Sequence, residues 1–182
     1  NRESTIIDGN QNGSVVTLIG VENSTSEFSN FTIRNGIANG EYPFNTGGGI
    51  YCQQSNLILK NLIIENNSAI YAGGGINIWD SSSPELENLI IRNNSAPYGG
   101  GVDLYLANPT FKNLHIYGNQ ALEYSGGGID IWNSSIEISN SEIYDNSAPY
   151  GGGIYCRDSN PSFVNVTITG NTSSSGGGIY CG

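Results

Sequence analysis

The chain has 182 residues, including 26 glycines, and its 16 acidic and 6 basic side chains give a formal net charge of −10. A surface this acidic repels phosphate backbones, which argues against nucleic acid as a partner. No apolar run approaches the roughly 20 residues that cross a bilayer, so we expect no membrane span.

The glycines are periodic, and their period predicts the fold. A period of this size is typical of a solenoid, in which repeats stack on one another and share one core. We expect residues 1–182 to form one domain that is a fragment of a longer chain or is processed from one. Triplets of glycine recur at spacings of 26, 26, 27, 25 and 25 residues, beginning at Gly47, Gly73, Gly99, Gly126, Gly151 and Gly176.

In chain order, the first repeat begins near Ile7, and the first irregularity is the segment 34–46. Ile33 to Ile64 spans 31 residues, so this segment is predicted to project as an inserted loop. The repeat from Leu86 is regular, with two short alternating runs, a turn at 93–98, three glycines and a run at 102–105. Alternation with β-branched and aromatic residues predicts strands. The sequence therefore predicts an all-β, right-handed parallel β-helix of about seven coils, with three short strands per coil and a period of about 26 residues.

Two asparagine columns keep the same period. In the first, Asn follows an isoleucine by three residues; in the second, it follows an apolar residue by two. Stacked asparagines can link their amides from coil to coil, and they tolerate the left-handed backbone of a tight corner. The columns are Asn10, Asn67, Asn94, Asn119, Asn146 and Asn171, and Asn30, Asn61, Asn88, Asn113, Asn140 and Asn165.

The strand after each glycine triplet carries the candidate binding surface. Alternation places its apolar residues in the core and leaves a polar and an aromatic column outside. Sugars have apolar faces and hydroxyl rims, so such a strip suits a polysaccharide or another cell-surface ligand. The alternative is that the stacked aromatics only stabilise the sheet. The strip consists of Asn77, Asp103 and Asp130, and of Trp79, Tyr105 and Trp132 with Arg157 beside them.

A second aromatic column lies just before the glycines. We interpret it as packing at the corner of the coil rather than as part of the strip. Its members are Tyr71, Tyr98, Tyr124 and Tyr150.

Asp103 and Asp130 fall in adjacent coils, with backbones about 4.8 Å apart. Glycosidases hold two carboxyl groups at comparable separations, so a polysaccharide lyase or glycoside hydrolase using this pair is an alternative function. Stacking of repeats produces such a pair without catalysis, and His115 lies on a different strand, so the balance favours a protein that is not an enzyme. Ca²⁺ bound by the pair is a further alternative; no other metal or cofactor is expected.

The three cysteines fit the core column of the strand after the glycines. Cys156 and Cys181 are one coil apart, but their side chains point the same way, which is poor geometry for a disulfide. We interpret them as free, buried thiols, while a bond between them stays an alternative. Cys52 is too far from both to pair within the chain.

The repeats resemble a known family. The strings 64–69, 91–96 and 143–148, each followed by a Gly-Gly-Gly block, are similar to the FxxN and GGxI repeats of chlamydial polymorphic outer-membrane proteins and related bacterial β-helix surface proteins. The departure is Ile in place of Phe. The resemblance covers nearly the whole chain and implies a pectate-lyase-like β-helix that serves in adhesion at a cell surface.

Three functions remain open at this point. The favoured one is a secreted or cell-surface solenoid with a structural or adhesive role that binds polysaccharide along the strip. The second is the polysaccharide-cleaving enzyme that uses Asp103 and Asp130. The third is a solenoid that self-associates end to end into filaments, because open coil ends present unpaired strand edges.

Overall fold

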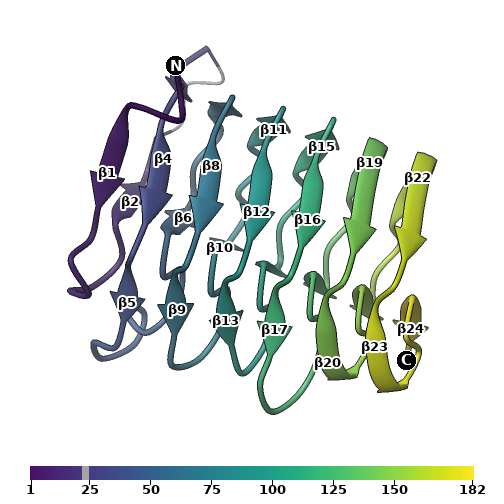
Figure 1. Cartoon of the computed structure of the whole chain (residues 1–182). Helices are drawn as coiled ribbons and strands as arrows, with labels where there is room; N and C mark the ends of the chain where they lie inside the picture. The colour runs from purple at the N-terminus through teal and green to yellow at the C-terminus, as the bar shows by residue number, and fades with distance from the viewer. Residues whose placement is uncertain (22–24) are drawn as a thin grey trace.

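The computed structural model describes residues 1–21 and 25–182 and consists of stacked coils of short strands (Figure 1). Each strand pairs in parallel with its equivalents one coil away, so that β10, for example, lies between β6 and β14. No helix occurs in these residues. It follows that no helical segment in the described ranges is long and apolar enough to cross a membrane.

The strands form three sheets that run the length of the solenoid. The seven-stranded sheet contains β2 (Val16–Ile19), β6 (Ile50–Gln53), β10 (Ile76–Trp79), β14 (Val102–Tyr105), β18 (Ile129–Trp132), β21 (Ile154–Arg157) and β24 (Ile179–Cys181). The six-stranded sheet contains β5 (Ile37–Ala38), β9 (Ser68–Ala69), β13 (Ser95–Ala96), β17 (Gln120–Ala121), β20 (Ser147–Tyr150) and β23 (Thr172–Ser175).

The third sheet is bent. It has eleven strands, and in most coils two of them, such as β7 and β8, follow each other directly. Its strands are β1 (Ile6–Asp8), β3 (Glu27–Ser29), β4 (Thr32–Arg34), β7 (Ile58–Lys60), β8 (Ile63–Glu65), β11 (Glu85–Glu87), β12 (Ile90–Arg92), β15 (Thr110–Lys112), β16 (His115–Tyr117), β19 (Glu137–Tyr144) and β22 (Ser162–Thr169).

The second asparagine column causes this bend. All six of its members have positive φ, between 50° and 66°, the left-handed conformation that Asn tolerates better than other residues with a side chain. In β19 and β22 the two runs join into one strand, with Asn140 and Asn165 inside it. The prediction of an all-β parallel solenoid is confirmed. The three short strands expected per coil correspond to the three sheets, and in most coils the bent sheet contributes two strands.

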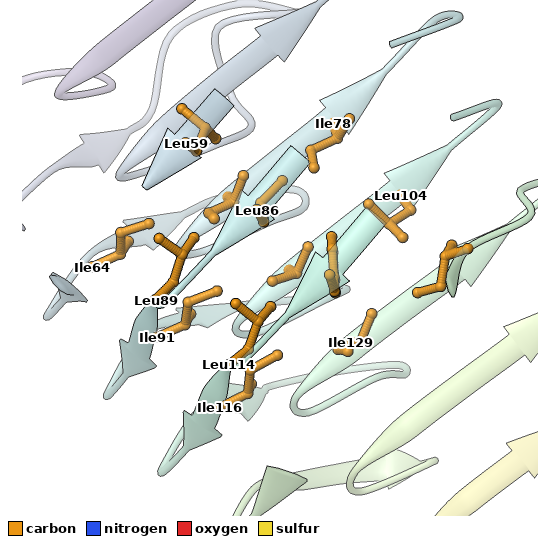
Figure 2. Packing of buried hydrophobic residues seen from close by; sticks show 14 of the residues in the cluster. Leu59, Ile64, Ile78, Leu86, Leu89, Ile91, Leu104, Leu114, Ile116 and Ile129 are labelled. Carbon is orange, nitrogen blue, oxygen red and sulfur yellow. The ribbon is translucent and has the colours of Figure 1, made fainter. Parts of the chain in front are cut away.

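The core is a stack of aliphatic columns from these sheets. Leu86 of β11, Ile91 of β12 and Leu104 of β14 are fully buried and converge from different sides of the coil (Figure 2). Neighbouring coils supply the same kind of residue at the same height, because the register pairs Leu86 with Leu59 and Ile91 with Ile64. Each coil therefore buries its apolar residues against the coils on both sides.

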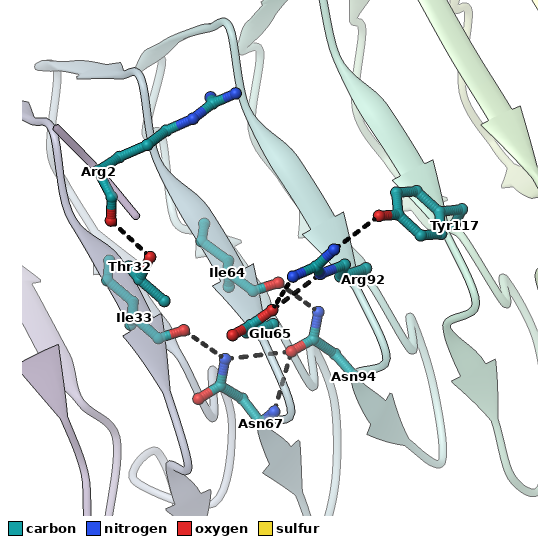
Figure 3. A network of polar contacts seen from close by, with 9 residues as sticks. All are labelled: Arg2, Thr32, Ile33, Ile64, Glu65, Asn67, Arg92, Asn94 and Tyr117. Carbon is teal, nitrogen blue, oxygen red and sulfur yellow. Dashed lines mark hydrogen bonds and ion pairs between the residues drawn. The ribbon is translucent and has the colours of Figure 1, made fainter. Parts of the chain in front are cut away.

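The first asparagine column forms the predicted amide ladder. Asn67 Nδ2 donates to Asn94 Oδ1 at 3.1 Å (Figure 3). Asn94 Nδ2 donates in turn to Asn119 Oδ1 at 3.0 Å. Each amide also donates to an isoleucine carbonyl and accepts from a backbone N–H, as Asn94 does from Asn67. The ladder continues through Asn146 to Asn171. Asn10 is not part of the ladder, because its side chain is exposed. In the coil before Asn67 the equivalent position is Gly36, whose backbone N–H donates to Asn67 Oδ1.

The glycine triplets form the corner before every strand of the seven-stranded sheet except β2. Gly73 has a φ of 64°, and a Cβ there would lie 2.8 Å from the Asn77 Cβ. The segment that precedes the strand therefore folds over the strand's outward side. Gly74 is restricted differently: a Cβ there would lie 2.4 Å from the Ser95 carbonyl oxygen, so adjacent coils can approach only if no side chain is present.

Two local features differ from the sequence-based expectations. The inserted residues lie at 39–46 rather than 34–46, because Ile37 and Ala38 form β5 and pair with β9. The three cysteines are free thiols, as interpreted, but only Cys52 and Cys156 are buried. Cys181 lies in β24, which pairs only with β21 among the described strands, and it is exposed.

Candidate functional site

The candidate site is a pocket on the outward side of the seven-stranded sheet, which we call the aromatic pocket. Its volume is about 380 Å³, within the range of about 300–1,000 Å³ usual for small-molecule sites. The described residues that line it are Tyr42, Pro43, Thr46, Tyr71, Ala72, Asn77, Trp79, Tyr98, Asp103, Tyr105, Asp130 and Trp132.

The floor is the polar column of the sheet. Asn77, Asp103 and Asp130 occupy the same position in β10, β14 and β18, and the register pairs each with the next. Period-2 alternation turns their side chains away from the core, as the sequence predicts. One strand spacing of about 4.8 Å separates their backbones.

Two rows of aromatic side chains stand on either side of this floor. Two positions after the floor residues, on the same strands, lie Trp79, Tyr105 and Trp132, with Tyr105 and Trp132 edge to face at 5.4 Å. The opposite row comes from the segments before the glycines, where Tyr71 and Tyr98 have ring centroids 5.6 Å apart. The pocket is thus a polar strip between two aromatic walls, a combination typical of ligand sites.

The inserted loop contributes to one end. Tyr42 meets Trp79 edge to face at 5.5 Å, and Thr46 lies at the floor, where its hydroxyl is 3.4 Å from Asn77 Oδ1. Phe44 contacts Tyr51, which precedes Asn77 in the floor column and is fully buried. The loop therefore covers the column at Tyr51, whereas the floor residues from Asn77 onward line the aromatic pocket.

The two carboxyl groups of the floor are held by neutral donors. Asn77 Nδ2 donates to Asp103 Oδ2 at 2.6 Å, and the Ser125 hydroxyl donates to Asp130 Oδ2. Burial raises the pKa of Asp103 well above its ordinary value; the charge of Asp130 raises it further, and the bond from Asn77 opposes both. Burial also raises the pKa of Asp130, to about 6, against the bond from Ser125. Near neutral pH the pair can therefore hold a proton that an exposed pair would lose.

The exposed strip expected from the sequence is wrong for part of its length. Asn77 is 3% exposed and Asp130 is 4% exposed, because the segment before the glycines folds over the outward side of the strand. The tyrosines before the glycines are not packed into the corner either. Tyr71, Tyr124 and Tyr150 are 45–48% exposed, and Tyr71 and Tyr98 form a wall of the pocket.

Arg157 and His115 lie outside the pocket. Arg157 follows Trp132 in the aromatic column, and its guanidinium carbon lies 4.7 Å from the Trp132 ring centroid. Its Nε is 3.7 Å from a carboxylate oxygen of the exposed Asp158. His115 is on the bent sheet, 3.2 Å from Glu142. Neither residue lines the aromatic pocket.

Sequence reasoning missed Tyr42, Thr46 and Ser125 at this site and separated the tyrosine row from the strip. The usable signal was the spacing across the glycines. Ser125 and Asp130 are five residues apart on either side of a triplet, and their side chains are hydrogen-bonded. A triplet with one glycine at positive φ makes a turn that brings these flanks together.

Metal binding has limited support from the geometry. Within residues 1–21 and 25–182, no group of three or more His, Cys, Asp and Glu side chains lies close enough together to hold a metal ion. The pair Asp103 and Asp130 offers two carboxylates, with neutral oxygen atoms from Asn77 and Thr46 beside them. Ca²⁺ prefers six to eight oxygen ligands, so this pair alone does not make a Ca²⁺ site.

The comparisons with known proteins bear on the family alone. A family model described as a right-handed beta helix region matches residues 2–182. No significant match is found among curated proteins or among solved structures. The predicted β-helix is confirmed by this match, and the resemblance to chlamydial polymorphic outer-membrane proteins stays a prediction.

Proposed function

The chain belongs to the right-handed β-helix family, and from this premise we propose that it is an extracellular or cell-surface solenoid with a structural or adhesive role that holds a polysaccharide in the aromatic pocket. We include an extracellular or cell-surface location in this proposal, since many β-helix domains are found there. The observation that carries the proposal is the pairing of two aromatic walls with a polar floor in one cavity of about 380 Å³.

Carbohydrate chemistry fits each part of this arrangement. The apolar faces of pyranose rings stack on indole and phenol rings, and such contacts add to the free energy of area burial. The hydroxyl groups need hydrogen-bond partners, which the amide of Asn77 and the carboxyl groups of Asp103 and Asp130 supply. A repeating ligand also suits a site whose residues repeat from strand to strand at about 4.8 Å.

The test is the removal of the wall formed by the two tryptophans. We expect the double variant Trp79→Ala and Trp132→Ala to weaken glycan binding at least about tenfold, which corresponds to about 1.4 kcal/mol for the two lost platforms. Glycan arrays identify the ligand, and calorimetry of oligosaccharides measures the affinity. Unchanged affinity in the double variant would exclude the aromatic pocket as the binding site.

A matched control exists on the bent sheet. Tyr117 and Tyr144 also stack from adjacent strands, at 4.8 Å with an interplanar angle of 9°, and both are half-buried. The double variant Tyr117→Ala and Tyr144→Ala removes a comparable aromatic pair outside the pocket. It should keep the wild-type affinity for the glycan.

The buried carboxyl pair supports a second candidate function, glycoside hydrolysis in the same pocket. Catalysis of this kind needs one protonated and one ionised carboxyl group beside the glycosidic bond. Burial raises the pKa of both Asp103 and Asp130, so the pair can share one proton. The protonated group would donate to the leaving oxygen, and the ionised group would act as nucleophile or activate water.

Product analysis separates the two candidates. If the protein is a hydrolase, reducing ends are released from a bound oligosaccharide, and Asp103→Asn abolishes release while the substrate still binds. If it is a binding module, the ligand is recovered intact after prolonged incubation with wild-type protein. Intact ligand across every glycan that binds would overturn the hydrolase candidate without affecting the binding proposal.

A further inference from the structure

In the described part of the chain, the aromatic pocket has acidic side chains in its lining but no basic ones. Among the described residues that line it are two carboxyl groups, Asp103 and Asp130, and no Lys, Arg or His. The nearest basic residue of the column, Arg157, lies over the outer edge at Trp132 and beside Asp158. An anionic sugar such as a uronate would therefore meet two buried acids and no cation.

Each carboxyl group has one oxygen to offer to a ligand. Asp103 and Asp130 both accept their hydrogen bonds at Oδ2, from Asn77 and Ser125. Their Oδ1 atoms accept no hydrogen bond from any residue in the described ranges. Asp130 is 4% exposed and Asp103 is half-buried, so both acids have limited contact with water, and no described lining residue supplies a counter-charge. A buried charge is expensive unless it is paired, and a ligand that carries a cation would pair it.

The walls favour a cation as well. A cation is attracted to the face of an aromatic ring, most strongly to tryptophan, and more so where water is excluded. Trp79, Tyr98 and Tyr105 are half-buried around the two acids. Aromatic rings beside carboxylates are the combination that recognises organic ammonium groups.

We propose that the aromatic pocket recognises an amino-sugar polymer, with a protonated primary amine held between Asp103 and Asp130. This inference rests on the proposed polysaccharide-binding function and specifies its ligand class. Neutral sugar rings can stack on the aromatic walls, but they form no ion pair with Asp103 or Asp130. The ammonium group adds charge-assisted hydrogen bonds to the two Oδ1 atoms, which are the stronger kind.

The test compares two ligands of the same length and backbone, a glucosamine oligomer with charged amines and its fully N-acetylated counterpart with neutral acetamides. At a pH at which the amines are protonated, we expect the free amine form to bind wild-type protein at least about tenfold more tightly. A neutral glucose oligomer should resemble the acetylated form, and a galacturonate oligomer should bind most weakly. Calorimetry gives the affinities, and the fluorescence of Trp79 and Trp132 reports occupancy of the pocket.

Two variants separate the floor from the general acidity of the chain. The double variant Asp103→Asn and Asp130→Asn keeps the shape of the floor and removes its charge, so the ratio between the two ligands should fall toward one while the acetylated oligomer still binds. The matched control, Glu137→Gln with Glu142→Gln, removes two exposed charges on the bent sheet. This control should keep the wild-type ratio, and an equal fall of the ratio in both double variants would overturn the proposal.

The outcomes distinguish this inference from the proposed function. Equal affinity of wild-type protein for the amine and acetylated oligomers would overturn the inference and leave polysaccharide binding intact. Tighter binding of the galacturonate oligomer would overturn it as well. Failure of every oligomer to bind, with circular dichroism showing a folded solenoid, would overturn the proposed function itself.

Discussion

Asp130 illustrates how a single residue links the stability of the solenoid to its site. Its carboxyl group lies on a strand that the chain itself covers, and burial raises its pKa from 3.8 to about 6. A carboxyl group whose pKa is raised on folding keeps its proton in the folded state at a pH at which the unfolded chain has lost it. Unfolding then releases protons, so this residue makes the protein less stable as pH rises from about 4 to above 6.

We therefore predict that Asp130→Asn stabilises the protein at neutral pH. Asn keeps an acceptor for the Ser125 hydroxyl without the buried charge, and a pKa raised from 3.8 to about 6 corresponds to at most about 3 kcal/mol. Thermal unfolding at several pH values checks this: the variant should melt higher than wild type near pH 7 and equally near pH 3. Glu137→Gln, which removes an exposed charge, should show no such gain. An Asp130→Asn protein less stable at neutral pH would contradict the proposed burial cost.

At the scale of one element, the asparagine ladder stabilises the corner of the coils from Asn67 to Asn171. Asn94 accepts hydrogen bonds from the backbone N–H and the amide of Asn67, and it donates to the Ile64 carbonyl and to Asn119. Its side chain is almost completely buried. Truncation would leave these partners out of contact with water, and each buried polar group without a partner costs about 1–3 kcal/mol.

Asn94→Ala should accordingly lower the free energy of unfolding by about 3 kcal/mol or more. Urea denaturation followed by circular dichroism measures the loss. The control is Asn160→Ala, because Asn160 is exposed and lies outside the ladder; we expect its midpoint to stay near that of wild type. A similar midpoint for Asn94→Ala and Asn160→Ala would mean that the ladder does not stabilise the fold.

The glycine corner allows a second comparison within an element. Gly74→Ala places a Cβ about 2.4 Å from a backbone oxygen of the adjacent strand segment, and overpacking of this kind costs about 3 kcal/mol or more. Gly20→Ala is the matched control, since Gly20 has a φ of 68° but open space around it, so only the left-handed backbone is penalised, by about 1 kcal/mol. Urea midpoints should rank wild type, Gly20→Ala and Gly74→Ala in that order. Equal losses in the two variants would contradict close approach of the coils at Gly74.

The same elements explain what could be predicted from the sequence. A period of 25–27 residues places equivalent residues side by side, so Ile64 and Ile91, or Asn67 and Asn94, follow from spacing alone. Alternation correctly assigned Asp103 and Asp130 to the outward side of their strands. Alternation does not say what lies above that side, so the cover over Asn77 and Asp130 could not be predicted.

The tyrosine wall was misinterpreted because its members do not share one phase. Tyr98 and Tyr150 directly precede a glycine triplet, whereas Tyr71 and Tyr124 lie one residue earlier. Strand alternation would send the two kinds to opposite sides. Irregular backbone before the glycines lets Tyr98 and Tyr124 nevertheless stack at 4.3 Å, and this geometry has no sequence signal of its own.

At the scale of the whole molecule, the coils are not equally covered. The aromatic pocket spans β10, β14 and β18 in the middle of the stack, where the core residues of these strands are fully buried. In the last coil the equivalent Ile179 of β24 is 39% exposed, and Phe163 of β22 is 37% exposed. Elements with few buried apolar contacts open at lower free energy, so opening of the 182-residue chain should be easier in the last coil than in the middle.

The three cysteines report this opening without any mutation, because they occupy one column at different distances from the last coil. Cys181 of β24 is exposed, Cys156 lies one coil inside it, and Cys52 lies in β6 near the other end. Burial raises the pKa of Cys156 to about 12 and that of Cys52 to about 11, and only the thiolate reacts with alkylating reagents. Both buried thiols must therefore become exposed by local opening before they react.

We predict that iodoacetamide labels Cys181 first, Cys156 more slowly and Cys52 slowest. Cys156 needs only the poorly covered last coil to open, whereas Cys52 is fully buried beneath β2, whose Val16 and Leu18 are only partly exposed. Peptide mass spectrometry over a time course gives the three rates, and in concentrated urea they should become similar because burial is lost. Labelling of Cys52 as fast as that of Cys156 would show that the two ends open equally, and the difference in exposed apolar surface would then not govern the local stability of the solenoid.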